Sequence, residues 1–348
     1  MSRLAAAPYN PETGIRTLAG RSREGVAFIL SALSAGTLPM TVEELTELRH
    51  KRYNATVVSL KLLNPDLMVL RVKPDFPRPP HHPGQYCTLG LGYWERRTEA
   101  CQVETLPPAD VTKVVRRAYS ISCSVLNEAG HLMRLEENDW LEFYIVLVRE
   151  NFDGRVPALT PRLFALVEGD RIQIGERITG HYTLDPVKHG DTVVFLGTGT
   201  GEAPHNYMTW ELLSRGHTGK IVNACCVRYS RDLGYHDIHR HLMAQFPNYE
   251  YLALATREPG VTRKVYIQDL ITSGELEEHT GAALDPATTH VFLCGNPKMI
   301  GVPHHDRDTG ATTYPQPVGV IEVLEARGFA ADIAATKFKG NVHFEEYW

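Results

Sequence analysis

Cysteines are scarce in this sequence, and their spacing excludes several classes of protein. Six occur among 348 residues, at positions 87, 101, 123, 225, 226 and 294. They show neither the regular short intervals of a disulfide framework or zinc site nor the clusters that hold an iron–sulfur centre. The pairs His81-His82 and His304-His305 have no further ligand at a diagnostic spacing. We therefore expect reduced thiols in a cytoplasmic protein, and no metal site.

Long hydrophobic runs are also absent. The one apolar stretch near the start, residues 26–38, is shorter than the ~20 residues that span a bilayer. The basic residues Arg21 and Arg23 come after residue 20, whereas a secretory signal opens with its basic region. Neither an integral membrane segment nor a nucleic-acid partner is expected.

Charge is divided unevenly along the chain. Residues 1–120 hold 16 Lys and Arg against 11 Asp and Glu, or +5, so the remainder of a chain with net charge −5 carries −10. The basic part, which includes Arg96, Arg97 and Arg116, could face an acidic partner. Ordinary scatter of surface charge explains the same counts equally well.

The length favours two domains with an appendage. Residues 1–49 form an N-terminal extension, expected to be helical because residues 26–38 suit a helix and Thr41 to Glu44 fit a capping box. Residues 50–186 contain short β-branched runs separated by turns, typical of an antiparallel β domain closed into a barrel. Residues 187–348 alternate apolar strands with helical segments, which predicts a parallel α/β domain. The sequence does not indicate a role for the long segments 92–115 and 301–320.

A glycine-rich turn suggests nucleotide binding. Gly197-Thr198-Gly199-Thr200-Gly201 follows the apolar strand 192–196 and precedes a helical run. Glycines let the backbone approach a pyrophosphate, and amides at a helix start favour anionic charge. The spacing is not G-x-G-x-x-G, so an ordinary Rossmann dehydrogenase is disfavoured.

A second motif, Arg117-Ala118-Tyr119-Ser120, lies on a predicted strand. Strand alternation puts Arg117, Tyr119 and Ile121 on one face and Ala118, Ser120 and Ser122 on the other. Taken alone, this is an ordinary amphipathic strand.

Six motifs in a fixed order give the chain a resemblance to the bacterial ferredoxin–NADP reductase family. They are Arg117-Ala118-Tyr119-Ser120 with the preceding Pro83-Gly84-Gln85-Tyr86, the segments 141–146 and 159–163, the turn 197–204, Cys294-Gly295-Asn296-Pro297-Lys298-Met299, and the terminal Glu346-Tyr347-Trp348. The match covers roughly residues 53–348. It implies an antiparallel β-barrel that binds FAD, followed by a Rossmann-like domain that binds NADP(H).

The resemblance also implies roles around the flavin. Tyr119 would pack against the isoalloxazine ring, Ser120 would bond near N5, and Arg117 would bind the pyrophosphate. Trp348 would cover the other flavin face and move aside for the nicotinamide, as a gate. The FAD site would be completed by Ala118, Tyr144, Ile145, Val146 and Thr160. Thr160 could equally be a helix N-cap.

The nucleotide side is implied in the same way. Arg228 and Arg257 would bind the 2′-phosphate and favour NADP(H). A third contact is open, because the family's Gly-Arg-Ile appears as Lys264-Val265-Tyr266 after Arg263. Cys294, followed by Gly295 and Asn296, would lie near the nicotinamide, although a buried structural thiol is the competing interpretation. Glu346 would relay a proton to the flavin, or it would be a residue of the C-terminal tail with no catalytic role.

The function implied is transfer of electrons between NADP(H) and ferredoxin or flavodoxin, with Ser120, Cys294, Glu346 and Trp348 as the catalytic set. Flavin exchanges one hydride for two single electrons, which suits such a carrier. The alternatives are an oxygenase reductase or flavin reductase of the same fold, and a non-catalytic nucleotide-binding subunit of a larger complex.

Overall fold

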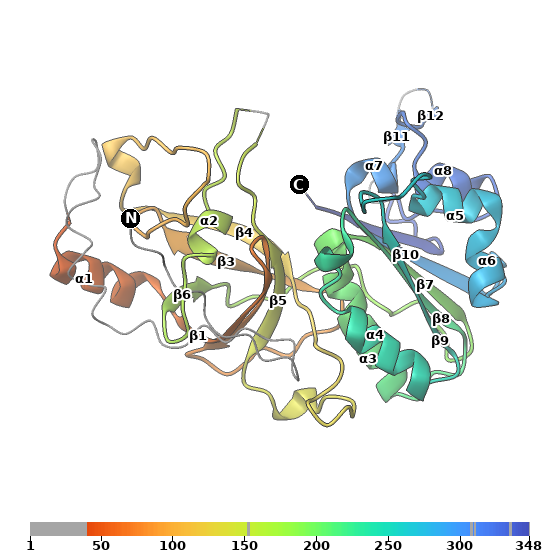
Figure 1. The fold of residues 1–348 in the computed structure, drawn as a ribbon, viewed down its shortest axis with the longest axis horizontal. Coiled ribbons are helices and arrows are strands. Elements are labelled where there is room, and N and C mark those ends of the chain that lie inside the picture. The colour runs from red at the N-terminus through yellow and green to blue at the C-terminus, as the bar shows by residue number, and fades with distance from the viewer. Residues whose placement is uncertain (1–39, 152–153, 307–308, 310, 334–335, 348) are drawn as a thin grey trace.

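The computed structural model describes residues 40–151, 154–306, 309, 311–333 and 336–347 (Figure 1). The apolar stretch 26–38 and Trp348 lie outside these residues, so the expectations made for them are not addressed by the structure. Among the described residues, no helix is both long and apolar enough to cross a bilayer.

The first sheet is antiparallel and has six strands: β1 (Ala55–Asn64), β2 (Leu67–Pro74), β3 (Tyr86–Gly92), β4 (Val114–Ser120), β5 (Leu141–Val146) and β6 (Arg171–Ile174). Their order is β4-β3-β6-β1-β2-β5. Just past β4, an antiparallel bridge between Ser122 and Glu142 joins the two edge strands. The sheet is therefore closed around an apolar core that includes Met68, Leu89 and Phe143, as the strand pattern predicts.

The second sheet is parallel and has five strands: β7 (Thr192–Thr198), β8 (Ile221–Val227), β9 (Tyr249–Ala255), β10 (Thr289–Gly295) and β13 (Val342–Glu346). Their order is β13-β10-β7-β8-β9, and all pairs are parallel. The chain starts at the centre with β7 and runs first to one edge and then to the other. In such sheets the ligand crevice opens at the carboxyl ends of the strands where this order reverses, here between β7 and β10.

Helices cover both faces of the parallel sheet, as expected for this fold class. One face packs against α5 (Ile267–Ser273), α6 (Glu275–Thr280), α7 (Pro297–Ile300) and α8 (Val320–Glu325). The other packs against α3 (Glu202–Ser214) and α4 (His236–Gln245). Figure 1 shows the barrel and this helix-covered sheet side by side.

Helix α3 contacts both sheets. Ala203 packs against Leu67, Val69 and Tyr144 of the barrel, and Tyr207 joins the barrel core. The indole Nε1 of Trp210 donates to the carbonyl of Met133 at 2.8 Å. Every residue from 202 to 209 is buried. Because one helix is packed on both sides, the two sheets are held in a fixed relation.

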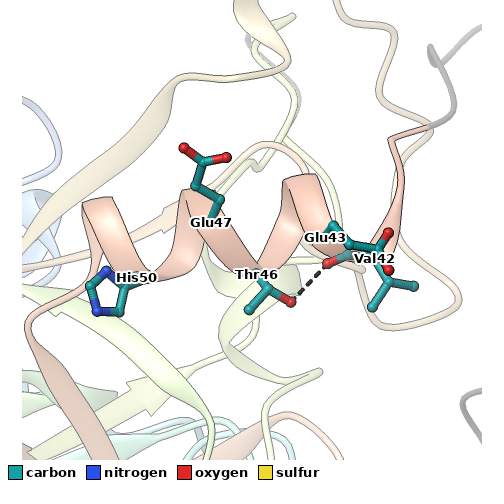
Figure 2. A pocket seen from close by; sticks show the side chains of 5 residues that line it. All are labelled: Val42, Glu43, Thr46, Glu47 and His50. Carbon is teal, nitrogen blue, oxygen red and sulfur yellow. Dashed lines mark hydrogen bonds between the residues drawn. The ribbon is translucent and has the colours of Figure 1, made fainter.

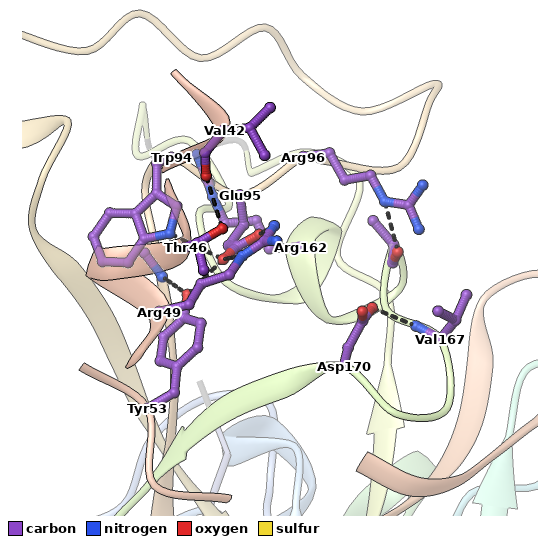
Figure 3. Close-up of polar contacts among 12 residues, drawn as sticks. Val42, Thr46, Arg49, Tyr53, Trp94, Glu95, Arg96, Arg162, Val167 and Asp170 are labelled. Carbon is purple, nitrogen blue, oxygen red and sulfur yellow. Dashed lines mark hydrogen bonds and ion pairs between the residues drawn. The ribbon is translucent and has the colours of Figure 1, made fainter. Parts of the chain in front are cut away.

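The N-terminal helix α1 (Val42–Arg52) begins with the predicted capping box, in which Thr41 and Glu44 each accept from the other's backbone amide. Glu95 holds the helix to segment 92–115 by accepting from Arg49, Tyr53 and Trp94 (Figure 3). The face of α1 lined by Val42, Thr46 and His50 is open (Figure 2). The extension thus has a structural attachment that the sequence did not reveal.

Segment 92–115 is tied down at a second point. Arg162, in the short helix α2 (Thr160–Leu163), pairs with Glu104, and both side chains are buried. Arg96 and Arg97 donate to the backbone carbonyls of residues 165, 102 and 157. They therefore hold this segment in place. Arg96 remains exposed, so the expectation that these arginines face an acidic partner stays a prediction.

Segment 301–320 contains a two-stranded hairpin, β11 (His304–His305) and β12 (Thr312–Thr313). Within the part of the chain that the structure describes, no three His, Cys, Asp or Glu side chains gather as metal ligands would.

Candidate functional site

The glycine-rich turn lies at the carboxyl end of β7, beside the end of β10. A Cβ on Gly201 would lie 2.2 Å from the carbonyl oxygen of Cys294. Gly295 has φ +122°, and a Cβ there would lie 2.3 Å from Thr198 Oγ1. That hydroxyl accepts from the amide of Asn296 at 2.7 Å. Two motifs about a hundred residues apart therefore form one surface, and only glycine allows the approach.

This surface includes the start of α3. Gly201 caps the helix without any side-chain hydrogen bond, whereas the Glu202 amide donates to the carbonyls of Gly199 and Thr200. The positive end of the helix dipole favours an anion at this place. Gly197, Gly199 and Thr200 complete the turn, with φ +54° at Gly199. The turn can accept a phosphate group at the switch point of the sheet.

A cluster of polar groups lies where the barrel meets β10 and β13. Cys294 is fully buried, and burial raises the pKa of its thiol well above the usual value. Ser120, at the end of β4, is buried, and its hydroxyl makes no hydrogen bond of good geometry among the described residues. Burial also raises the pKa of Tyr347, with smaller effects from Cys294, Glu345 and Ser120. Barrel and sheet thus contribute to one site, in which Cys294 is a neutral thiol.

Glu345 is a member of this cluster that the sequence reasoning missed. It stands opposite Cys294 in the β10–β13 ladder, so the two side chains share a face, whereas Glu346 stands opposite Gly295. Burial raises the pKa of Glu345 to about 7. Its Oε2 is buried without a partner among the described residues. Burial also raises the pKa of Glu346. The two glutamates differ because of the register between β10 and β13, which cannot be read from the sequence.

On the barrel, β4 departs from the expected alternation. Arg116, Arg117 and Ala118 are all exposed, whereas Ser120, Ile121 and Ser122 are all buried. The reason is that the end of β4 is covered on both sides, by the barrel core and by the second sheet. The side chain of Arg117 bonds only to the carbonyl of Arg116 among the described residues, and it can reach a ligand.

The remaining flavin-side residues have mixed surroundings. Tyr119 packs against the barrel core, Ile145 is buried, and Val146 is 44% exposed at the end of β5. Thr160 begins α2 and accepts from the amide of Val148 at 3.1 Å. Its alternative role as an N-cap is wrong, because Leu159 occupies that position.

Tyr144 has a different use from the one expected. It is 3% exposed, its hydroxyl donates to the carbonyl of Asp232 at 3.1 Å and accepts from the amide of Gly234 at 3.0 Å. The hydroxyl is thus committed to the second sheet's loop. It is not available to the flavin.

The predicted phosphate-binding arginines end neighbouring strands. The amide of Arg257, after β9, donates to the carbonyl of Arg228, after β8, at 2.7 Å, and both side chains are exposed. Arg231 is a further exposed cation nearby, with its guanidinium 4.7 Å from the Tyr229 ring centroid. Arg263 pairs with Glu275 at 3.3 Å. Lys264 is exposed.

Comparison with known proteins agrees with this arrangement. The family model described as the oxidoreductase NAD-binding domain matches residues 195–304. The flavodoxin/ferredoxin–NADP reductase of Escherichia coli is 34% identical over 188 residues, which cover 53% of this chain and 69% of that protein. Ferredoxin–NADP reductase A of Sorangium cellulosum is 28% identical over 257 residues, 71% and 73% of the two chains.

Solved structures share the fold. A ferredoxin NADP+ reductase from Neisseria gonorrhoeae with bound FAD and NADP has a TM-score of 0.59 at 20% identity, covering 84% of this chain and 97% of that one. The Plasmodium falciparum ferredoxin-NADP+ reductase with 2′P-AMP has a TM-score of 0.56 at 15% identity, with coverage of 86% and 97%. From the sequence relatives, the chain belongs to the flavodoxin/ferredoxin–NADP reductase family.

Proposed function

We propose that this chain is an FAD-dependent reductase that passes electrons between NADP(H) and ferredoxin or flavodoxin. The observation that carries the proposal is the meeting of Ser120 from the barrel with Cys294 and Tyr347 from the parallel sheet. A reductase of this kind must bring two cofactors together at such a boundary. The limits 50–186 and 187–348 are our proposed extents of the FAD and NADP domains.

The barrel residues fit FAD. Arg117 presents an exposed guanidinium that suits a pyrophosphate, and Val146 offers apolar surface to a ring. The Ser120 hydroxyl is buried and has bonding capacity left for a ligand. When bound, flavin would supply the exchange of one hydride for two single electrons. Tyr119 would hold the ring plane, and Trp348 remains the predicted cover of its other face.

The parallel sheet fits NADP(H). The turn from Gly197 to Gly201 and the positive end of the α3 dipole would bind the pyrophosphate, while Cys294, Gly295 and Asn296 would border the nicotinamide. Arg228, Arg257 and Arg231 would surround the 2′-phosphate. The pairing of Arg263 with Glu275 makes it a weaker candidate for the third contact.

Where the barrel meets the parallel sheet, the surroundings of Cys294 and Glu345 suit each side chain to a particular role. Cys294, a neutral buried thiol, would exclude water and fill space beside the nicotinamide. Glu345 would hold or release a proton near neutral pH, because its pKa is about 7. We therefore assign the proton-carrying role to Glu345 in place of Glu346.

Replacement of the arginines tests the choice of NADP(H). Arg228→Ala and Arg257→Ala each remove a charged hydrogen-bond donor, worth about 1.5–3 kcal/mol. We expect KM for NADPH to rise roughly 10- to 100-fold while KM for NADH changes little. Steady-state kinetics with a dye acceptor would measure both. An equal loss with the two nucleotides would contradict this assignment.

The same proposal extends to the carrier protein and to the cellular location. Arg116 is exposed beside Arg117 and is a basic side chain that an acidic carrier could meet. All six cysteines are free thiols, which suits a reducing cytoplasm. The rival functions are less well supported, since the curated relatives named above are ferredoxin or flavodoxin reductases.

A further inference from the structure

The loop from Arg228 to Tyr235 has little structure of its own. It contains one turn, η5 (Ser230–Asp232), in which Asp232 N donates to Tyr229 O at 2.8 Å and Tyr229 N donates to Asp232 Oδ2 at 3.3 Å. Two exposed arginines, Arg228 and Arg231, project from it. Its conformation must therefore depend on what it contacts.

The first part of the loop bonds within its own domain, where Arg228 O accepts from Arg257 N and Ser230 N donates to Glu258. The second part, residues 231–235, is held by the barrel. Asn64, the last residue of β1, donates through Nδ2 to the carbonyl of Arg231 at 3.0 Å and to Asp232 Oδ1 at 3.1 Å. Its own Oδ1 accepts from the amide of Asp66 at 2.8 Å, which orients the side chain. The Tyr144 hydroxyl bonds to Asp232 O and Gly234 N. Two barrel side chains thus satisfy polar groups of residues 231–234.

The loop also fits closely against these side chains. A Cβ on Gly234 would lie 2.5 Å from the Tyr144 hydroxyl oxygen and 2.5 Å from Leu63 Cδ1. A glycine at this position lets the loop backbone lie directly on the barrel.

The end of the loop is anchored in the barrel as well. Tyr235 is 2% exposed, and its hydroxyl donates to Glu142 Oε1 at 3.0 Å. The other oxygen of Glu142 accepts from Arg71 at 2.9 Å and from Ser124 at 2.7 Å. The Tyr235 ring meets that of Tyr144 edge to face, with centroids 4.9 Å apart. A buried carboxylate on β5 therefore holds the loop's last residue.

We propose that the FAD-side barrel sets cofactor choice: Asn64 and Tyr144 are positioning residues that hold the 228–235 loop so that its arginines meet the 2′-phosphate of NADP(H). The proposal rests on the assignment of Arg228 to that phosphate. NADH has no 2′-phosphate, so its binding does not depend on where these guanidinium groups lie. Loss of the barrel contacts should act on one nucleotide and spare the other.

Asn64→Ser tests this with little change in size, and Tyr144→Phe is the second variant. We expect KM for NADPH and the dissociation constant of 2′-phospho-AMP, measured by calorimetry, to rise about three- to tenfold. KM for NADH and affinity for 5′-AMP should stay within about twofold. Flavin absorbance per protein should be unchanged in Asn64→Ser, which separates a loop effect from loss of FAD.

Tyr53→Phe is the matched control. Its hydroxyl also has one donor and one acceptor contact, with Gly92 N at 2.8 Å and Glu95 Oε1 at 2.9 Å, on the α1 side of the barrel (Figure 3). It should leave the ratio of KM for NADPH to KM for NADH unaltered. If Arg228→Ala raises this ratio but Asn64→Ser and Tyr144→Phe do not, the positioning role is wrong while the phosphate site stands. If Arg228→Ala has no effect on the ratio, both are wrong.

Discussion

At the scale of single residues, the two glutamates before the C-terminus differ because strand β13 gives them different neighbours. Glu345 shares a face with Cys294 and has a pKa of about 7, whereas Glu346 aligns with Gly295. A carboxyl group in this range can take up and release protons under physiological conditions. The position on the strand, more than the residue type, gives Glu345 its chemistry.

This difference predicts a pH effect on stability. Because the folded pKa of Glu345, about 7, exceeds the ordinary value of a glutamate, the folded chain binds the proton more tightly, and the free energy of unfolding falls as pH rises from about 5 to about 8. Glu345→Gln should remove this part of the fall, so the variant gains stability relative to the natural chain at the higher pH. Denaturant unfolding at several pH values measures it. If the free energy of unfolding changes with pH to the same extent in both proteins, the raised pKa assigned to Glu345 is wrong.

The residues of the site were predictable to different degrees. The glycines of the turn belong to a local motif, so the sequence pointed to them directly, whereas Arg228 and Arg257 were implied by the family resemblance and stay predictions. Glu345 and Arg231 depend on ladder register and loop conformation, and Tyr144 on a contact with residues 232–234. Such contacts join distant parts of the chain, and no local pattern records them.

At the scale of elements, the turn between β7 and α3 functions through its fit against β10. Gly201 lies so close to the Cys294 carbonyl that any side chain must push the turn away, whereas a Cβ on Gly199 would have open space around it. The two glycines are therefore needed for different reasons: one for close packing, the other for its φ of +54°.

Alanine at each position separates these reasons. Gly199→Ala should cost about 1–2 kcal/mol of unfolding free energy, from backbone strain alone. Gly201→Ala should cost about 3 kcal/mol or more and weaken NADPH binding, because the turn and β10 must separate. Thermal unfolding and nucleotide titration measure both effects. Equal losses in the two variants would show that close packing at Gly201 has no special role.

Most of the strands were predictable from the sequence. The predicted strand 192–196 lies within β7, and the β-branched runs expected in residues 50–186 form strands such as β1 and β2, because β-branched and apolar residues mark buried strands. The alternation expected for β4 was wrong at its end, where Ser120 to Ser122 are buried on both sides. Alternation holds only while one face meets solvent.

At the scale of the whole molecule, the barrel and the parallel sheet share a helix and a loop. Helix α3 packs on both, and residues 231–234 of the loop bond to the barrel side chains of Asn64 and Tyr144. The sequence predicted the two architectures from the pattern of apolar residues in each half of the chain. It did not show which apolar residues pack against each other. How the halves meet could be learned only from the folded structure.

The most direct test of the account is the rate at which NADPH reduces ferredoxin through the FAD-loaded protein, followed at low and high salt. We expect a yellow protein whose flavin absorbance bleaches faster with NADPH than with NADH. Added ferredoxin should then be reduced, more slowly at high salt, as electrostatic docking requires. A protein that binds no FAD, or that NADPH bleaches without any ferredoxin reduction at either salt concentration, would contradict the proposed function.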